Sequence, residues 1–161
     1  MKLEITNRIL RNEYYLSQLR YLEKLEKDRI FCCHNMEHFL SVARITLILC
    51  SRNGTVIPED IVYSAALLHD IGRVEEYTEG IPHDVASQKT AERVLDEVGC
   101  ADDEKQLIIS LIAGHRMDGL DPETPEAVFG RADKLSRNCF ECGARKKCKW
   151  KKESMNLEIE V

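Results

Sequence analysis

The 161-residue chain has a formal net charge of −5, and 43% of its residues are hydrophobic, which is typical of a globular chain of one domain. The acidic charge argues against general electrostatic binding of nucleic acid, and no apolar run is long enough for a transmembrane helix. Residues 1–8 lack the apolar core of a signal peptide. We therefore expect a cytoplasmic protein without membrane association, whose seven cysteines are mostly reduced thiols or metal ligands.

Helical periodicity dominates the sequence, and strand-like alternation is almost absent, which predicts an all-α fold. Glycine and proline mark the boundaries of the predicted elements. Residues 75–82 are expected to form a loop. The predicted helices cover residues 5–28, 35–52, 58–72, 84–98 and 102–115 and a segment from 122 or 125 through 135. The sequence thus predicts a bundle of about six helices over residues 1–138 and an irregular, Cys-rich basic tail over 139–161, packed on the same domain.

The most informative segment is residues 65–73, Ala-Ala-Leu-Leu-His-Asp-Ile-Gly-Arg. His69 and Asp70 end an apolar helix, where an unpartnered imidazole and carboxylate are costly to bury. A divalent metal ion would satisfy both groups at once. His38 lies upstream and Asp133 lies inside a later apolar helix, so that the chain offers a set of nitrogen and oxygen donors suited to Mn, Fe, Co, Ni or Zn.

These residues resemble the HD-domain superfamily of metal-dependent phosphohydrolases. The similarity lies in His38-x-x-x-Val42, Leu67-Leu68-His69-Asp70-Ile71-Gly72-Arg73 and Ala132-Asp133-Lys134, and it extends over roughly residues 30–137. It implies an HD-type helical bundle in which His38, His69, Asp70 and Asp133 hold a metal ion. It also implies hydrolysis of a phosphate ester or anhydride in a nucleotide or other small substrate. His34 is expected to support the site or to cap a helix, and Asn35 replaces an Asp that some members carry.

His83 and His115 bear on the number of metal ions. They fall where the two-metal members that cleave dinucleoside polyphosphates carry additional histidines, and the resemblance then implies that Asp70 bridges two ions. The alternative is that His83 caps the helix after it and that His115 lies at a helix C-terminus, where its charge is favoured. The sequence leaves one ion and two ions open.

Phosphoryl transfer needs positive charge around the phosphate oxygens. Arg73 occupies a position where the family usually has Lys or Arg, while Arg116 and Lys134 each follow a predicted ligand directly. We expect these three residues to bind phosphate, and Asp70, Arg73 and Lys134 to be catalytic. Arg131 and Arg137 are weaker candidates, because most arginines are surface charges.

The tail carries the pattern Cys139-x-x-Cys142-x5-Cys148. Zinc sites and iron–sulfur clusters usually take four thiolates, and Cys33, or its neighbour Cys32, is the natural fourth ligand. The two chain regions must be close if His38 and Asp133 share a metal ion. The spacing therefore predicts a zinc or iron–sulfur site of Cys33, Cys139, Cys142 and Cys148, the alternative being a set of reduced thiols.

Three functions compete for this sequence. The complete donor set favours a phosphohydrolase. A second possibility is a binding module that keeps the metal site without turnover and senses metal or redox state through the tail. The third is nucleic-acid binding through the basic residues 145–152, which the net charge disfavours; that run can equally be a solvated face or can steer an anionic substrate.

Overall fold

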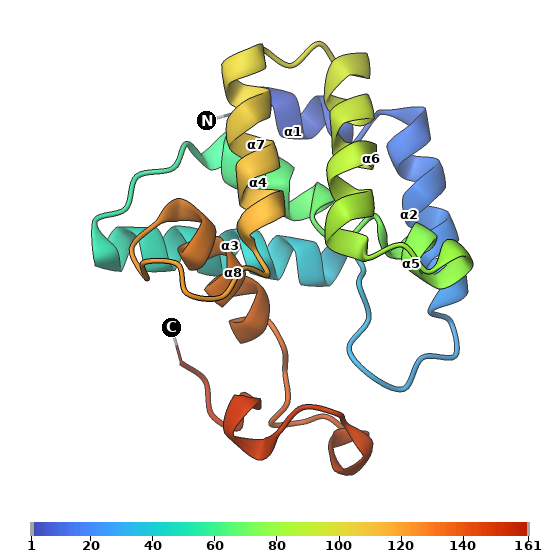
Figure 1. Cartoon of the computed structure of the whole chain (residues 1–161), viewed down its shortest axis with the longest axis vertical. Coiled ribbons are helices and arrows are strands. Elements are labelled where there is room, and N and C mark those ends of the chain that lie inside the picture. Colours follow the sequence, from blue (N-terminus) through green and yellow to red (C-terminus); the bar gives the residue numbers. More distant parts are fainter. Residues whose placement is uncertain (1, 161) are drawn as a thin grey trace.

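The computed structural model describes residues 2–160, which form eight α-helices and no β-strand (Figure 1). This confirms the predicted all-α class. None of the described helices is long and apolar enough to cross a membrane. Residues 1 and 161, the outer ends of the two predicted segments, lie outside the described residues. The helices are α1 (Glu4–Ile9), α2 (Glu13–Leu25), α3 (Met36–Asn53), α4 (Glu59–Leu68), α5 (Arg73–Glu79), α6 (His83–Glu97), α7 (Asp102–Gly114) and α8 (Pro125–Leu135).

Two short helices account for the difference from the predicted six. Residues 5–28 form α1 and α2 rather than one helix, because Asn12 begins a new helix by accepting a hydrogen bond from the Tyr15 N–H. The predicted loop over residues 75–82 is wrong, since α5 occupies most of it. That helix ends at Gly80, whose positive φ of 75° is the left-handed conformation of a helix C-terminus. The glycine and proline there separate two helices rather than marking a long loop.

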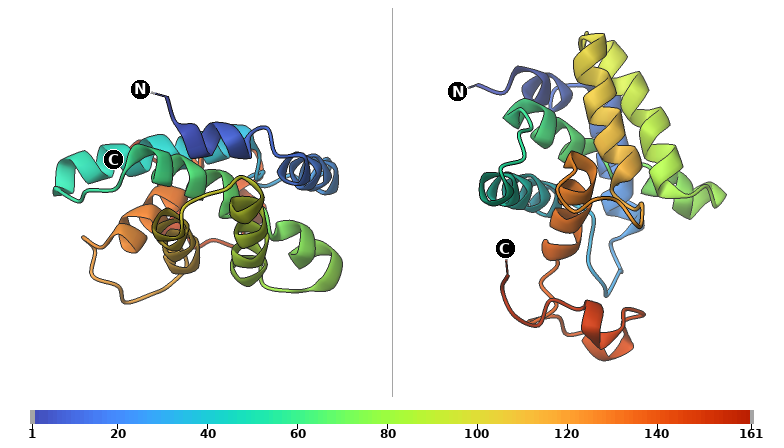
Figure 2. Two further views of the ribbon diagram at one scale, coloured as in Figure 1. Left: turned by 90° about the horizontal axis from the view of Figure 1, so that it is seen from above. Right: turned by 60° about the vertical axis from the view of Figure 1, so that its left-hand side comes forward.

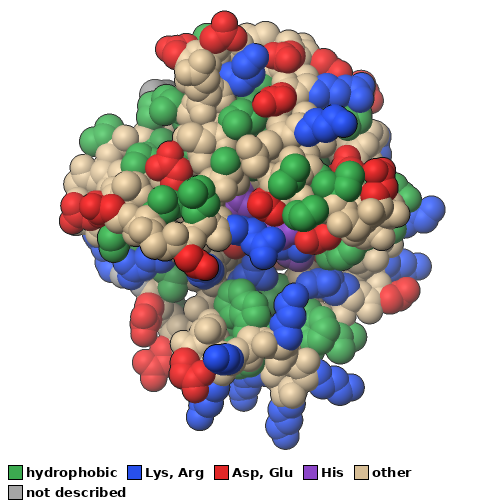
Figure 3. Space-filling view, viewed as in Figure 1, with side chains coloured by type: hydrophobic (Ala, Val, Ile, Leu, Met, Phe, Trp, Pro, Cys, Tyr) green, Lys and Arg blue, Asp and Glu red, His purple; other side chains and the backbone are tan. Residues whose placement is uncertain are grey.

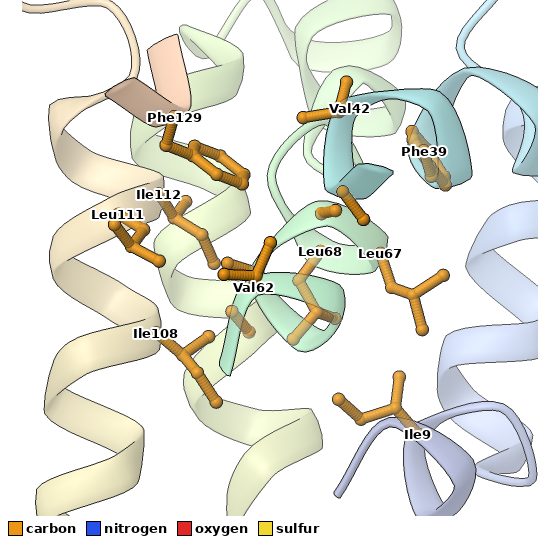
Figure 4. Packing of buried hydrophobic residues seen from close by; sticks show 14 of the residues in the cluster. Ile9, Phe39, Val42, Val62, Leu67, Leu68, Ile108, Leu111, Ile112 and Phe129 are labelled. Atoms are coloured by element: carbon orange, nitrogen blue, oxygen red, sulfur yellow. The ribbon is translucent and has the colours of Figure 1, made fainter. Parts of the chain in front are cut away.

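The central helix of the bundle is α4, in which seven of ten residues are buried. It contacts α1, α3, α6 and α7, and Figure 2 shows it between α1–α3 on one side and α6–α8 on the other. Figure 4 shows its residues Val62, Leu67 and Leu68 packed among side chains of α1, α3, α7 and α8. Each buried side chain of this kind stabilises the fold by about 1.5–3 kcal/mol. The C-terminal end of α4 is therefore held firmly inside the molecule.

The tail leaves the bundle after α8 as irregular chain with two 3-10 turns, Arg145–Lys147 and Lys152–Ser154 (Figure 1). Within residues 139–160, Cys139 alone is buried. Asn156 Nδ2 donates hydrogen bonds to the carbonyls of Lys134 (2.7 Å) and Arg137 (2.9 Å). The Arg137 guanidinium also lies 5.0 Å from the centre of the Trp150 ring. These contacts anchor the tail to the C-terminal end of α8.

Candidate metal centre

Helix ends bring the predicted ligands together. His38 lies in the first turn of α3, and Asn35 begins that turn by accepting a hydrogen bond from the His38 N–H (3.0 Å). His69 follows the last residue of α4, and Asp70 lies in the tight turn after it. Because α4 is buried along its length, its end delivers both residues to the interior, where each is at most 1% exposed. Asp133 reaches the same point from α8.

The first group of donors consists of His38, His69, Asp70 and Asp133, whose ligand atoms all lie within 4.8 Å of one another. Asp70 Oδ2 is 3.1 Å from His69 Nε2 and 3.4 Å from His38 Nε2. Asp133 Oδ1 is 3.4 Å from His38 Nε2 and 3.7 Å from His69 Nε2. Two imidazoles and two carboxylates thus face one common point.

Unpaired buried atoms show that this group fits a cation. The Nε2 atoms of His38 and His69 and the Oδ2 atom of Asp70 are buried and have no hydrogen-bond partner within the chain. Buried polar atoms are nearly always paired in folded proteins, and each unpaired one costs about 1–3 kcal/mol. A divalent first-row metal would satisfy all three, and this mixture of nitrogen and oxygen donors suits such an ion.

A second group consists of Asp70, His83 and His115, whose ligand atoms also lie within 4.8 Å of one another. His83 is the first residue of α6, and His115 follows α7. His83 Nε2 lies 3.3 Å from Asp70 Oδ1, the oxygen that faces away from His69. Arg73 donates from Nε to the same oxygen (2.9 Å), and its Nη2 lies 3.3 Å from His83 Nε2. A second ion would therefore have to displace Arg73 from His83.

The Nδ1 atom of each of these histidines faces a hydrogen-bonding group, which turns the Nε2 atom toward the site. The partners are Ser136 Oγ for His38 (3.1 Å), the Ala66 carbonyl for His69 (2.9 Å), Glu76 Oε1 for His83 (2.9 Å) and the Ile112 carbonyl for His115 (2.5 Å). The carbonyls and the Glu76 carboxylate only accept, so Nδ1 of His69, His83 and His115 carries a proton, and Nε2 is the nitrogen that each of these rings turns toward the site. Metal-binding histidines are commonly oriented in this way. Glu76 and Ser136, which contact the rings of His83 and His38, are not among the residues predicted from the sequence.

Electrostatics also favour a cation at the first group. Burial alone lowers the pKa of His69, but the Asp70 and Asp133 carboxylates raise it to about 10. Burial opposes ionisation of Asp70, yet contacts with His69, His38 and Arg73 hold the pKa of this carboxyl well below its usual value. In the absence of a metal ion, the site thus keeps its carboxylates ionised and holds a proton on His69.

The predicted phosphate-binding residues differ in their distance from this centre. Arg73 lies inside it, bound to Asp70 and to Glu76 Oε2 (2.9 Å). Arg116 is exposed, with Nη1 3.6 Å from Asp84 Oδ1, and Lys134 is exposed on α8. The roles of Arg73, Arg116 and Lys134 in phosphate binding therefore stay predictions.

In Figure 3, histidine atoms are recessed in the middle of one face, with basic and acidic side chains around them.

Arg137, a weaker candidate from its sequence context, contacts the centre. Its Nη2 donates to both carboxylate oxygens of Asp133, at 3.2 and 3.4 Å. The two residues are four apart on α8 and its C-terminal end, so this pairing could have been found from helical spacing. Arg137 fixes the orientation of a predicted ligand.

The cysteines of the predicted tail site are free of disulfides. Within residues 2–160, the groups of three or more ligand atoms within 4.8 Å are the two described above, so Cys33, Cys139, Cys142 and Cys148 do not form such a group. Cys32 instead lies near Arg137. Burial lowers the pKa of the Arg137 guanidinium, but Asp133, Asp70 and Cys32, in decreasing order of effect, raise this pKa above its usual value. A metal or cluster in the tail stays a prediction.

Comparisons with known proteins agree with this picture. The model of the HD domain family matches residues 35–138, a span that contains both groups of donors. A protein of Clostridium beijerinckii (strain ATCC 51743 / NCIMB 8052), described as "Uncharacterized protein", is 37% identical over 153 residues, which cover 95% of this chain and 96% of that protein. No solved structure is a significant match.

Proposed function

Because the chain belongs to the HD-domain family, we propose that it is a metal-dependent phosphohydrolase acting on a nucleotide or another small phosphate ester or anhydride. Proteins of this family bind divalent metals and are generally hydrolases. The observation that carries the proposal is the set of His38, His69, Asp70 and Asp133, three of whose atoms are buried and lack a partner within the chain.

We assign one metal ion to each of the two groups of donors. In this proposal His38, His69, Asp70 and Asp133 hold the first ion, which is Mn, Fe, Co, Ni or Zn. Asp70 Oδ1, His83 and His115 support a second ion. Ions held there supply Lewis acidity to a phosphate group and make water a stronger nucleophile at neutral pH.

Arg73 is the chain's own cation beside the reacting group. Its guanidinium is bound to Asp70 and Glu76 and is 15% exposed, so it lies at the border between the buried donors and the solvent. A planar guanidinium is well shaped to bind two phosphate oxygens at once. We assign it to the phosphoryl group that is transferred. Arg116 and Lys134, which are exposed, would contact more distant parts of an anionic substrate.

A test of this function compares wild-type protein with Asp70→Ala. Each is loaded with Mn²⁺, Fe²⁺, Co²⁺, Ni²⁺ or Zn²⁺ and assayed against nucleoside mono-, di- and triphosphates, dinucleoside polyphosphates and a chromogenic phosphate ester. We expect at least one metal to support turnover in the wild type, and Asp70→Ala to lose both metal binding and turnover. Asp96→Ala removes an exposed carboxylate that pairs with Lys105 on α7, and it should behave as the wild type.

Two results would contradict the proposal. Turnover that survives in Asp70→Ala would show that the centre is not the site of catalysis. Metal binding in the wild type without turnover of any substrate would instead favour the module that senses metal or redox state.

A further inference from the structure

His34 directs its ring toward the same centre, although the sequence suggests only a supporting or capping role. It lies between α2 and α3, four residues before His38, and is 1% exposed. Its Nε2 atom is 3.8 Å from Asp70 Oδ2, and its ring centre is 5.6 Å from that of His38. Like the Nε2 atoms of His38 and His69, this atom is buried and has no hydrogen-bond partner within the chain.

Glu26 holds His34 in this orientation. Its Oε1 atom lies 2.6 Å from His34 Nδ1, and its Oε2 atom accepts a hydrogen bond from the His34 backbone N–H (2.7 Å). The Tyr77 hydroxyl of α5 also donates to Oε1 (2.7 Å). An ionised carboxylate only accepts, so Nδ1 carries the proton and Nε2 presents a lone pair toward Asp70.

A purely structural role explains only part of this arrangement. The bond from Glu26 to the His34 backbone ties the segment between α2 and α3 to the end of α2, and Tyr77 ties α5 to the same carboxylate. The contact of His34 Nδ1 with Glu26 Oε1 requires a side-chain donor at position 34, but it uses only one ring nitrogen. A side chain that only donated to Glu26 would serve this structural role without leaving a second nitrogen, Nε2, buried and unpaired next to an ionised carboxylate. The partner of Nε2 must therefore come from outside the chain.

We propose that His34 is a further protein ligand of the metal centre, on the side of Asp70 Oδ2, and that Glu26 is its positioning residue. This inference rests on the proposed function, since it assumes that the first group of donors holds an ion. His34 does not belong to the group of four atoms within 4.8 Å, so it joins the ion at the edge formed by Asp70 and His38. A carboxylate behind a ligating imidazole fixes the ring and increases its basicity.

Cobalt substitution tests the proposal through a spectroscopic signal. His34→Asn keeps an N–H that can donate to Glu26 and removes the ring nitrogen directed at Asp70. We expect this variant to bind Co²⁺ about 10- to 100-fold more weakly than the wild type and to change the visible d–d absorption of the bound ion. Glu26→Gln should change both properties in the same direction. Tyr77→Phe removes one hydrogen bond to Glu26 but keeps both contacts between Glu26 and His34, and it should leave the spectrum unchanged.

The possible outcomes separate this inference from the proposed function. A wild type that binds no Co²⁺ defeats both. A wild type that binds Co²⁺, together with a folded His34→Asn variant of the same affinity and spectrum, overturns the role of His34 and leaves the phosphohydrolase proposal intact. If circular dichroism shows that His34→Asn does not fold, the spectrum of Glu26→Gln decides: an unchanged spectrum overturns the proposal, and a changed one supports it.

Discussion

Asp70 is the residue on which the two halves of the centre depend. Its Oδ2 atom faces His38 and His69, while its Oδ1 atom faces His83 and accepts a hydrogen bond from Arg73. No other residue belongs to both groups of donors found within residues 2–160. The carboxylate is 1% exposed, so its partners are groups inside the molecule rather than bulk solvent. A change at Asp70 therefore affects both groups at once, whereas a change at His83 affects only the second.

The raised pKa of His69 predicts how metal affinity depends on pH. Without metal, Asp70 and Asp133 raise this pKa to about 10, so the imidazole is protonated at neutral pH and must lose its proton when a metal ion binds. Below the folded pKa, loss of one proton makes the apparent affinity rise about tenfold for each pH unit. We expect this slope between pH 6 and pH 8. Competition titrations with a chelator of known pH dependence would measure it.

Proton release provides a check on the same prediction. Calorimetric titrations in buffers of different ionisation enthalpy should show about one proton released per ion bound at the first group. An affinity that does not change between pH 6 and pH 8, with no proton release, would show that His69 is neutral in the metal-free protein.

The residues in and around the centre show which parts of it could be predicted from the sequence. His38, His69, Asp70 and Asp133 follow from a motif, because each lies in a recognisable helical context. Glu26 and Glu76 do not follow from a motif. Glu26 pairs with His34, eight residues later, across irregular chain, and Glu76 pairs with His83, seven residues later, across the segment predicted to be a loop. Helical periodicity reports which face of an element is apolar, but it does not report which polar groups meet between elements.

At the level of elements, the turn after α4 must fit closely against α6. A Cβ atom at Gly72 would collide with the Ser87 backbone nitrogen and would lie 2.7 Å from the His83 carbonyl oxygen. The Gly72 N–H also donates to Ser87 Oγ (2.9 Å). The contact places the start of α6, and hence His83, beside Asp70. The glycine of the motif is therefore required by packing rather than by an unusual backbone angle.

Gly72→Ala should weaken metal binding at the second group of donors and leave binding at the first group in place. The added methyl group must push α6 away, which we expect to destabilise the fold by about 1–3 kcal/mol and to displace His83. The first group comes from α3, α4 and α8 and should still bind an ion. Co²⁺ titration would then give fewer ions or weaker binding at the second group, and urea unfolding would measure the loss of stability.

Gly143→Ala is the matched control for this substitution. A Cβ atom at Gly143 meets no atom within 4 Å, so the unfolding free energy should change by no more than about 0.5 kcal/mol. Equal stability and equal Co²⁺ binding in Gly72→Ala and the wild type would show that the approach of α4 and α6 does not position His83.

At the level of the whole molecule, the bundle and the tail differ in what stabilises them. The bundle buries an apolar core around α4, whereas residues 139–160 bury only Cys139 and are joined to α8 by Asn156 and Trp150. Small segments without a core are often stabilised by metal ligands. The sequence could predict the thiols of the tail but not their arrangement, because the segment has no helical or strand periodicity to place them.

A metal site in the tail can be tested independently of the centre in the bundle. If Cys139, Cys142 and Cys148 bind zinc or an iron–sulfur cluster with Cys33 or Cys32, Cys139→Ser combined with Cys142→Ser should abolish that metal and leave the metal of the first group in place. Asp70→Ala should have the opposite effect. Elemental analysis of the wild type and both variants measures this, and the visible spectrum after anaerobic purification distinguishes a cluster from zinc. Equal metal content in the wild type and the double cysteine variant would mean that the thiols bind no metal, so that the contacts with Asn156 and Trp150 hold the tail without one.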